Sequence, residues 1–147
     1  MQIKYTTPPN WDKIVAKFNV KETDHNYYTY GDCIYIPSRI QVTQDILRHE
    51  MTHAEQQNHD ENVANIWWQN YIHDPEFRLD QEVEAYGNQY YFLCQNNKDR
   101  NKQARILHEF ASVLAGPLYN NCVEYQEAYR RIKESSKLSP DLDTQKK

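Results

Sequence analysis

The stretch His49-Glu50-Met51-Thr52-His53 places two histidines four residues apart, with a glutamate beside the first. Thr43 precedes it as an N-cap residue, and no glycine or proline interrupts the chain from there to Gln57. We therefore expect a helix over about residues 43–57. On such a helix the two histidines project from one face, one turn apart, so both imidazoles can reach a single metal ion.

The residue types in this stretch suit zinc chemistry. A catalytic zinc takes three protein ligands and keeps a further position for water. Glu50 lies beside that position, where its carboxylate can accept a proton from the water as it attacks a carbonyl carbon. Composition alone predicts roughly 0.02 such pentapeptides in a chain of this kind. The pattern is therefore informative, and a third ligand elsewhere in the chain would support it.

A downstream helical segment offers that third ligand. It contains Glu82 and Glu84, which point about 200° apart on a helix, so only one of them can face the metal. Glu82 shares its face with apolar residues, among them the small Ala85, which would allow close approach to the histidine helix. Glu84 shares its face with polar residues such as Asn88, which predicts a solvated face. We assign Glu82 to the metal.

Other readings of these residues stay open. The remaining histidines have no partner at ligand spacing and are interpreted as surface or capped residues: His25, His59, His73 and His108. His59 or His73 is the alternative third ligand if Glu82 does not serve. The run that contains Asp80, Glu82 and Glu84 also fits a solvated acidic face without a ligand role.

The flanking sequence predicts an α+β fold that is mostly helical. Two β-prone runs, residues 28–30 and 33–36, flank Gly31-Asp32 and predict a hairpin. Helices are expected over residues 11–18, 62–72, 75–93, 103–114 and 123–137. A small hairpin or short sheet thus stands on the N-terminal side of a helical body. The strand at residues 33–36 would offer an edge that binds an extended peptide by strand addition.

Length and composition limit the remaining possibilities. The 147 residues fit one domain, expected over residues 1–138, with residues 139–147 as a flexible tail. The net charge of -4, with both signs mixed and no polybasic stripe, argues against nucleic acid as a partner. Without a signal peptide or a long apolar run we expect a cytoplasmic protein that does not engage a membrane. The sequence leaves the oligomeric state open.

The pentapeptide and the segment Glu82-Val83-Glu84-Ala85-Tyr86 together resemble the gluzincin pattern, HExxH plus ExxA. This pattern is found in small zinc metallopeptidase-like domains, including uncharacterised phage and bacterial proteins. The resemblance covers about residues 28–93. It implies a zincin-like pair of active-site helices, with His49, His53 and Glu82 as zinc ligands and Glu50 as the base. A peptide or protein would be the substrate.

One position departs from that pattern. Many gluzincins place an aspartate four residues after the ligand glutamate, where it hydrogen-bonds a ligand histidine, and this chain has Tyr86 there. The tyrosine hydroxyl is a candidate to orient a histidine or to stabilise the oxyanion, and its ring is a candidate for packing. Because of this departure a second hypothesis stands beside the zinc peptidase, namely a non-catalytic zinc-containing binding protein on the same scaffold.

Overall fold

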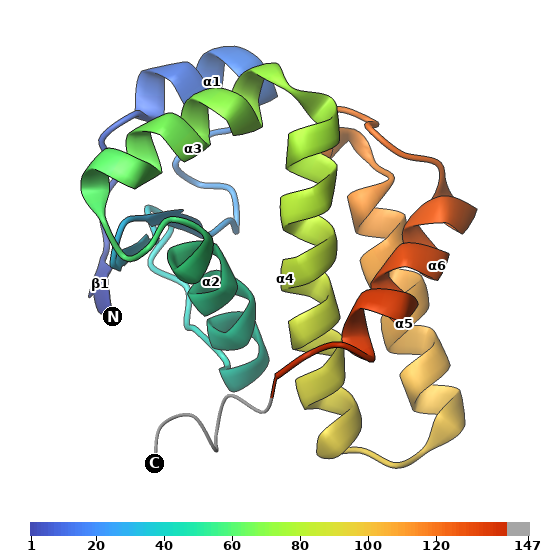
Figure 1. Cartoon of the computed structure of the whole chain (residues 1–147). Helices are drawn as coiled ribbons and strands as arrows, with labels where there is room; N and C mark the ends of the chain where they lie inside the picture. Colours follow the sequence, from blue (N-terminus) through green and yellow to red (C-terminus); the bar gives the residue numbers. More distant parts are fainter. Residues whose placement is uncertain (141–147) are drawn as a thin grey trace.

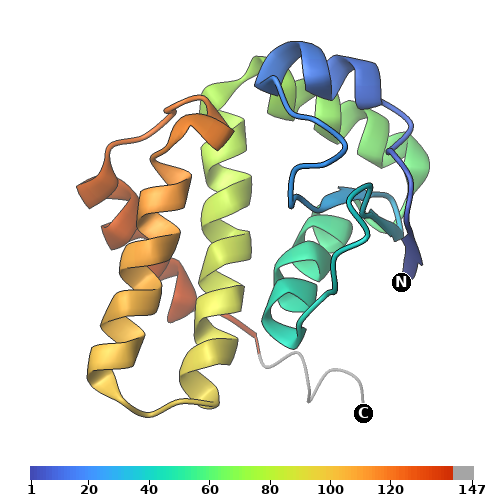
Figure 2. The same cartoon turned by 180° about the vertical axis from the view of Figure 1, so that it is seen from behind.

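A computed structural model describes residues 1–140 of the chain, and its longest helix, α4 (Pro75–Gln95), runs through the centre (Figure 1). On one side of α4 lie α5 (Arg100–Leu114) and α6 (Tyr125–Ser136). On the other side lie α2 (Gln44–Gln56) and a small sheet, while α1 (Trp11–Phe18) and α3 (Glu61–His73) cross one end, as Figure 2 shows from behind. A short 3-10 turn, η1 (Pro117–Tyr119), follows α5. The expected α+β, mostly helical class is confirmed.

The sheet has three short strands in the order β1-β3-β2: β1 (Gln2–Lys4), β2 (Tyr28–Tyr30) and β3 (Cys33–Tyr35). The predicted hairpin is present, with Tyr30 opposite Cys33 and Gly31 in its turn at a φ of +65°, a conformation that favours glycine. β1 pairs in parallel with β3. Because β3 is paired on both sides, the expected peptide-binding edge at residues 33–36 is wrong, and β1 and β2 form the edges.

Aspartates begin three of the helices. The side chains of Asp60, Asp74 and Asp99 each accept hydrogen bonds from two backbone N–H groups in the first turn of α3, α4 and α5. Pro75 follows Asp74 at the first helical position, where a proline costs no hydrogen bond. Thr43 stands at the N-cap position of α2, but its hydroxyl donates to Asp45 Oδ1 at 2.6 Å and does not cap the backbone.

Two faces of α4 are buried, one against α2 and one against α6. Gly87 faces α6, and a Cβ built there would lie 2.7 Å from Ser135 Oγ, so glycine permits the close approach of the two helices. Asn88 is also buried and donates to Thr52 Oγ1 of α2 at 2.9 Å. The expectation of a solvated face beside Glu84 is therefore wrong at Gly87, which α6 covers, and at Asn88, whose side chain bonds to Thr52 of α2 and to Ser139.

A buried arginine joins the ends of three elements. Arg78 of α4 is 1% exposed and donates to the carbonyls of Tyr71 and Ile72, both at 2.9 Å, and to the Tyr119 carbonyl at 3.4 Å. Its guanidinium also lies 5.1 Å from the centre of the Phe18 ring. Since carbonyl oxygens at helix ends lack intrahelical partners, Arg78 fixes the C-terminal end of α3 and the turn η1 against α4.

Two expectations concern the chain as a whole. Within residues 1–140, no helix combines the length and the apolar character that crossing a membrane requires. Most of the tail expected at residues 139–147 lies outside the described residues. Of its described part, Ser139 donates from Oγ to Asn88 Oδ1 at 2.6 Å.

Candidate metal centre

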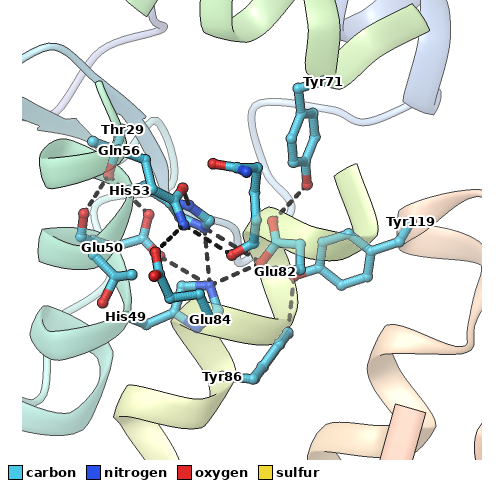
Figure 3. A network of polar contacts seen from close by, with 12 residues as sticks. Thr29, His49, Glu50, His53, Gln56, Tyr71, Glu82, Glu84, Tyr86 and Tyr119 are labelled. Carbon is cyan, nitrogen blue, oxygen red and sulfur yellow. Dashed lines mark hydrogen bonds and ion pairs between the residues drawn. The ribbon is translucent and has the colours of Figure 1, made fainter. Parts of the chain in front are cut away.

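Three side chains from α2 and α4 converge on one point (Figure 3). Glu82 Oε1 lies 3.1 Å from His49 Nε2 and 3.3 Å from His53 Nε2, and the two imidazole nitrogens are 3.2 Å apart. All three side chains are buried. Glu84 is exposed and instead accepts a hydrogen bond from Gln56 at 2.9 Å. The structure therefore brings together the three predicted ligands and excludes Glu84 from the group.

The size of this triangle fits a tetrahedral ion. Zinc bonds to nitrogen and oxygen of about 2.0 to 2.1 Å place tetrahedral ligand atoms about 3.3 to 3.4 Å apart. The observed separations of 3.1 to 3.3 Å need little change to accept such an ion. Two neutral imidazole lone pairs and a carboxylate oxygen repel one another at these distances unless a proton or a cation lies between them. The group could therefore hold a metal ion.

Without a metal, the group stabilises itself as an ion pair. Burial alone would raise the pKa of Glu82, but His53 and His49 hold this pKa well below its usual range. Burial alone would lower the pKa of His53, but the Glu82 carboxylate outweighs it and raises this pKa to about 9. A proton on His53 thus supplies positive charge that a metal ion would replace.

Glu50 lies beside the triangle and outside it. Its Oε2 is 3.8 Å from His49 Nε2, while its Oε1 accepts a hydrogen bond of 3.0 Å from Thr29 Oγ1 on β2. The pKa of Glu50 is raised above its ordinary value. Burial is the main cause and the Glu82 carboxylate adds to it, while His49 and His53 act in the opposite direction. One carboxylate oxygen is therefore fixed by the sheet, and the other lies near the point on which the three ligand atoms converge.

Thr29 is itself held by α3 and by the residue that follows α2. Its carbonyl accepts hydrogen bonds from Trp68 Nε1 of α3 at 2.9 Å and from Gln57 Nε2 at 3.1 Å. The oxygen of the Gln57 amide accepts from the backbone N–H of Gly31 at 2.7 Å. These bonds fix the hairpin to the end of α2, and they fix the position of the Thr29 hydroxyl that contacts Glu50.

Two glutamines orient the histidines. Gln89 Oε1 lies 2.9 Å from His49 Nδ1, and the Gln89 amide donates to Asp45 Oδ2 at 2.8 Å. Gln56 Oε1 lies 2.9 Å from His53 Nδ1, and its amide donates to Glu84. Because an amide oxygen only accepts, each pairing places a proton on Nδ1 and turns Nε2 toward the triangle, where it could bind a metal ion.

A tyrosine holds the second oxygen of the candidate ligand Glu82. Tyr71 of α3 donates from its hydroxyl to Glu82 Oε2 at 2.6 Å, and its ring stacks on Trp67 with centroids 4.8 Å apart. Burial and the Glu82 carboxylate raise the pKa of Tyr71 well above its ordinary value, so the hydroxyl keeps its proton. Glu82 therefore presents only Oε1 to the histidines.

Tyr86 contributes its ring to the centre. Its hydroxyl and that of Tyr119 are 2.9 Å apart, and its ring meets His49 edge to face with centroids 4.5 Å apart. The hydroxyl thus bonds to Tyr119 and the ring packs against His49, so in this structure the hydroxyl does not orient a histidine. Its role at an oxyanion stays a prediction. Gln89, two turns after Glu82 on α4, contacts the histidine instead.

The alternative third ligands lie elsewhere. His59 is exposed and its Nδ1 lies 2.7 Å from Asp32 Oδ1, and His73 is exposed at the end of α3.

Four residues that contact the triangle or Glu50 were not predicted from the sequence: Thr29, Gln56, Tyr71 and Gln89. Two of them carried a usable signal, since Gln56 follows His53 by three residues and Gln89 follows Glu82 by seven, which are same-face spacings on a helix.

A cavity of about 360 Å³ opens over the centre. Its lining includes His49, Glu50, His53 and Glu82, together with many aromatic and aliphatic side chains from α1, α3, α5 and η1. Trp67 and Trp68 both line it and both are buried. The candidate metal centre is thus connected to a space that can accept part of another molecule.

Comparison with known proteins adds no relative: no protein-family model, no curated protein and no solved structure matches the chain.

Proposed function

We propose that this protein is a zinc-dependent peptidase in which His49, His53 and Glu82 bind the metal and Glu50 acts as the general base. The observation that carries the proposal is the triangle of two Nε2 atoms and one carboxylate oxygen, with sides of 3.1 to 3.3 Å. Zinc is favoured over magnesium or calcium because two of the three ligand atoms are imidazole nitrogens.

The second support is the placement of Glu50. A bound zinc would polarise a peptide carbonyl and lower the pKa of a water molecule. Glu50 Oε2 is positioned to accept the proton of the attacking water, and Thr29 prevents the carboxylate from turning away. The same carboxyl group can then deliver that proton to the amine that leaves when the C–N bond breaks. The three ligand side chains keep their places because Gln56, Gln89 and Tyr71 hold them.

The test compares Glu50→Gln with Glu55→Gln, a matched change on an exposed position of the same helix. Zinc content is measured on each purified protein, and cleavage of a mixed peptide library is followed by mass spectrometry. We expect both variants to bind one zinc per chain. Glu50→Gln should lose cleavage by about 10²- to 10⁴-fold, and Glu55→Gln should cleave like the parent. Equal cleavage by Glu50→Gln, or no zinc in the parent, would sink the proposal.

The same experiment separates the non-catalytic alternative. A zinc-containing binding protein on this scaffold would hold one zinc per chain and show no peptide cleavage in any of the three forms. Its metal would then stabilise the fold by linking α2 to α4, and removal of zinc by a chelator would lower the melting temperature.

A further inference from the structure

The wall of the cavity formed by α5 and η1 is apolar although it reaches the surface. Phe110 and Val113 are three residues apart on one face of α5, and Leu118 follows in η1. Val113 is 43% exposed and Leu118 is 38% exposed, and both side chains line the cavity that contains the candidate metal centre. Large apolar side chains that remain exposed in such a place favour a binding role.

This apolar wall lies one aromatic ring from the metal ligands. The ring of Tyr86 is 4.5 Å from that of His49 and 5.1 Å from that of Phe110, measured between centroids. A peptide with its carbonyl at the triangle would therefore place a neighbouring side chain against Phe110, Val113 and Leu118.

The charges in the cavity restrict that side chain further. The lining includes three carboxylates, Glu50, Glu82 and Glu109, and its basic side chains among the described residues are three histidines, His25, His49 and His53, of which the last two belong to the candidate metal centre. The part of the lining that comes from α5 and η1 contributes Glu109 and no basic side chain. An acidic side chain placed against this wall would therefore find no cationic side chain to pair with. An uncharged side chain buries apolar area there without that cost.

We propose that Phe110, Val113 and Leu118 form a subsite for a large apolar side chain, of the phenylalanine or leucine class, next to the scissile bond of a peptide. This inference rests on the proposed peptidase function for the position of the scissile bond. The preferred substrate is then an internal apolar segment of a polypeptide, and peptides with an acidic residue at that position are poor substrates.

The experiment uses labelled peptides of one sequence that differ at a single position, which is phenylalanine, leucine, glycine or aspartate. Affinity is measured by fluorescence anisotropy with zinc-loaded Glu50→Gln, and kcat/KM is measured with the parent. We expect the phenylalanine and leucine peptides to bind and to be cleaved at least about tenfold better than the other two. Equal affinity for the phenylalanine and aspartate peptides would overturn the subsite.

Substitutions locate the preference. Val113→Asp and Leu118→Asp should each reduce the preference while zinc content and melting temperature stay near those of the parent, and Val113→Ser serves if the aspartate variant unfolds. Ile66→Asp is the control, because Ile66 is 61% exposed on α3 and does not line the cavity. If the Val113→Asp and Leu118→Asp variants both keep the parent's preference for the phenylalanine and leucine peptides, the subsite is contradicted. Apolar binding without cleavage contradicts only the peptidase, and cleavage without any preference contradicts only the subsite.

Discussion

The amide oxygen of Gln89 lies 2.9 Å from Nδ1 of His49, and the amide nitrogen of the same residue donates to Asp45. In the gluzincin pattern an aspartate at the position of Tyr86 makes a direct contact with a ligand histidine, and here Gln89 and Asp45 take that place. The neutral amide fixes the tautomer and the ring plane of His49, and it cannot remove the Nδ1 proton.

Gln89→Ala should weaken zinc binding by about 10- to 100-fold, because His49 loses the partner that orients it. The zinc dissociation constant is measured by competition with a chelating dye. Gln126→Ala, at an exposed position of α6, is the control and should bind zinc like the parent. An unchanged dissociation constant in Gln89→Ala would show that the hydrogen bond does not support the ligand.

Zinc uptake should release a proton near neutral pH. The pKa of His53 is raised to about 9 in the metal-free protein, so its imidazole is protonated there, and zinc needs the neutral form. Calorimetric titrations in buffers of different ionisation enthalpy count the protons released. The count should fall as pH rises toward 9. A proton count of zero near neutral pH would contradict the ion pair.

The same pair sets a pH dependence for the metal-free fold. Folding raises the pKa of His53 from its ordinary value of 6.5 to about 9. The ion pair therefore stabilises the folded state fully below pH 6.5, and this stabilisation is lost as the pH rises through about 9. The melting temperature of the zinc-free protein should therefore fall over this interval. His53→Gln, which cannot take up a proton at this position, should show a smaller fall.

Tyr71→Phe should leave zinc bound but change its coordination. The hydroxyl holds Glu82 Oε2 at 2.6 Å, so without it both carboxylate oxygens can reach the metal. Cobalt replaces zinc in the measurement, since its visible absorption weakens when a fifth ligand joins four. We expect weaker absorption in Tyr71→Phe than in the parent. Tyr91→Phe, on α4 and half-buried, is the control, and identical spectra for all three proteins would contradict the role of Tyr71.

Gly87→Ala should destabilise the fold. In an exposed helix this change would stabilise by about 1 kcal/mol, but here the new Cβ would lie 2.7 Å from Ser135 Oγ. We expect a net loss of about 1 to 3 kcal/mol in the free energy of unfolding, measured by urea denaturation. Combining it with Ser135→Ala should restore part of the loss, and a purely additive double variant would show that the clash is elsewhere.

Most helices of the fold could be predicted from short-range signals. The first helix was expected at residues 11–18 and lies at Trp11–Phe18, and Asp74-Pro75 marked the start of α4 correctly. The strand β1 could not be predicted, because Gln2–Lys4 is exposed and its pairing with β3 joins segments about thirty residues apart. The burial of Asn88 could not be predicted for a similar reason, since its partners are Thr52 of α2 and Ser139, three residues after the end of α6.

The candidate ligand group was predictable because helical geometry relates His49 to His53, and the composition of a face separates Glu82 from Glu84. The partners of these residues were harder. Thr29 reaches Glu50 from a strand, and Tyr71 reaches Glu82 from another helix, and no spacing rule within one element predicts such contacts. Gln89 was not predicted as the partner of His49 because the gluzincin pattern has an aspartate as the partner of a ligand histidine.

The tight fit of α6 against Gly87 lets the C-terminal third of the chain support the helix that carries Glu82. A fragment that stops at Asn96 would keep every donor atom, but its ligand-bearing helix would lose the support on its back face and expose it to water. Such a fragment should bind zinc loosely or fail to fold. Under the proposed function, α6 therefore supports ion binding although none of the three candidate ligand side chains belongs to it.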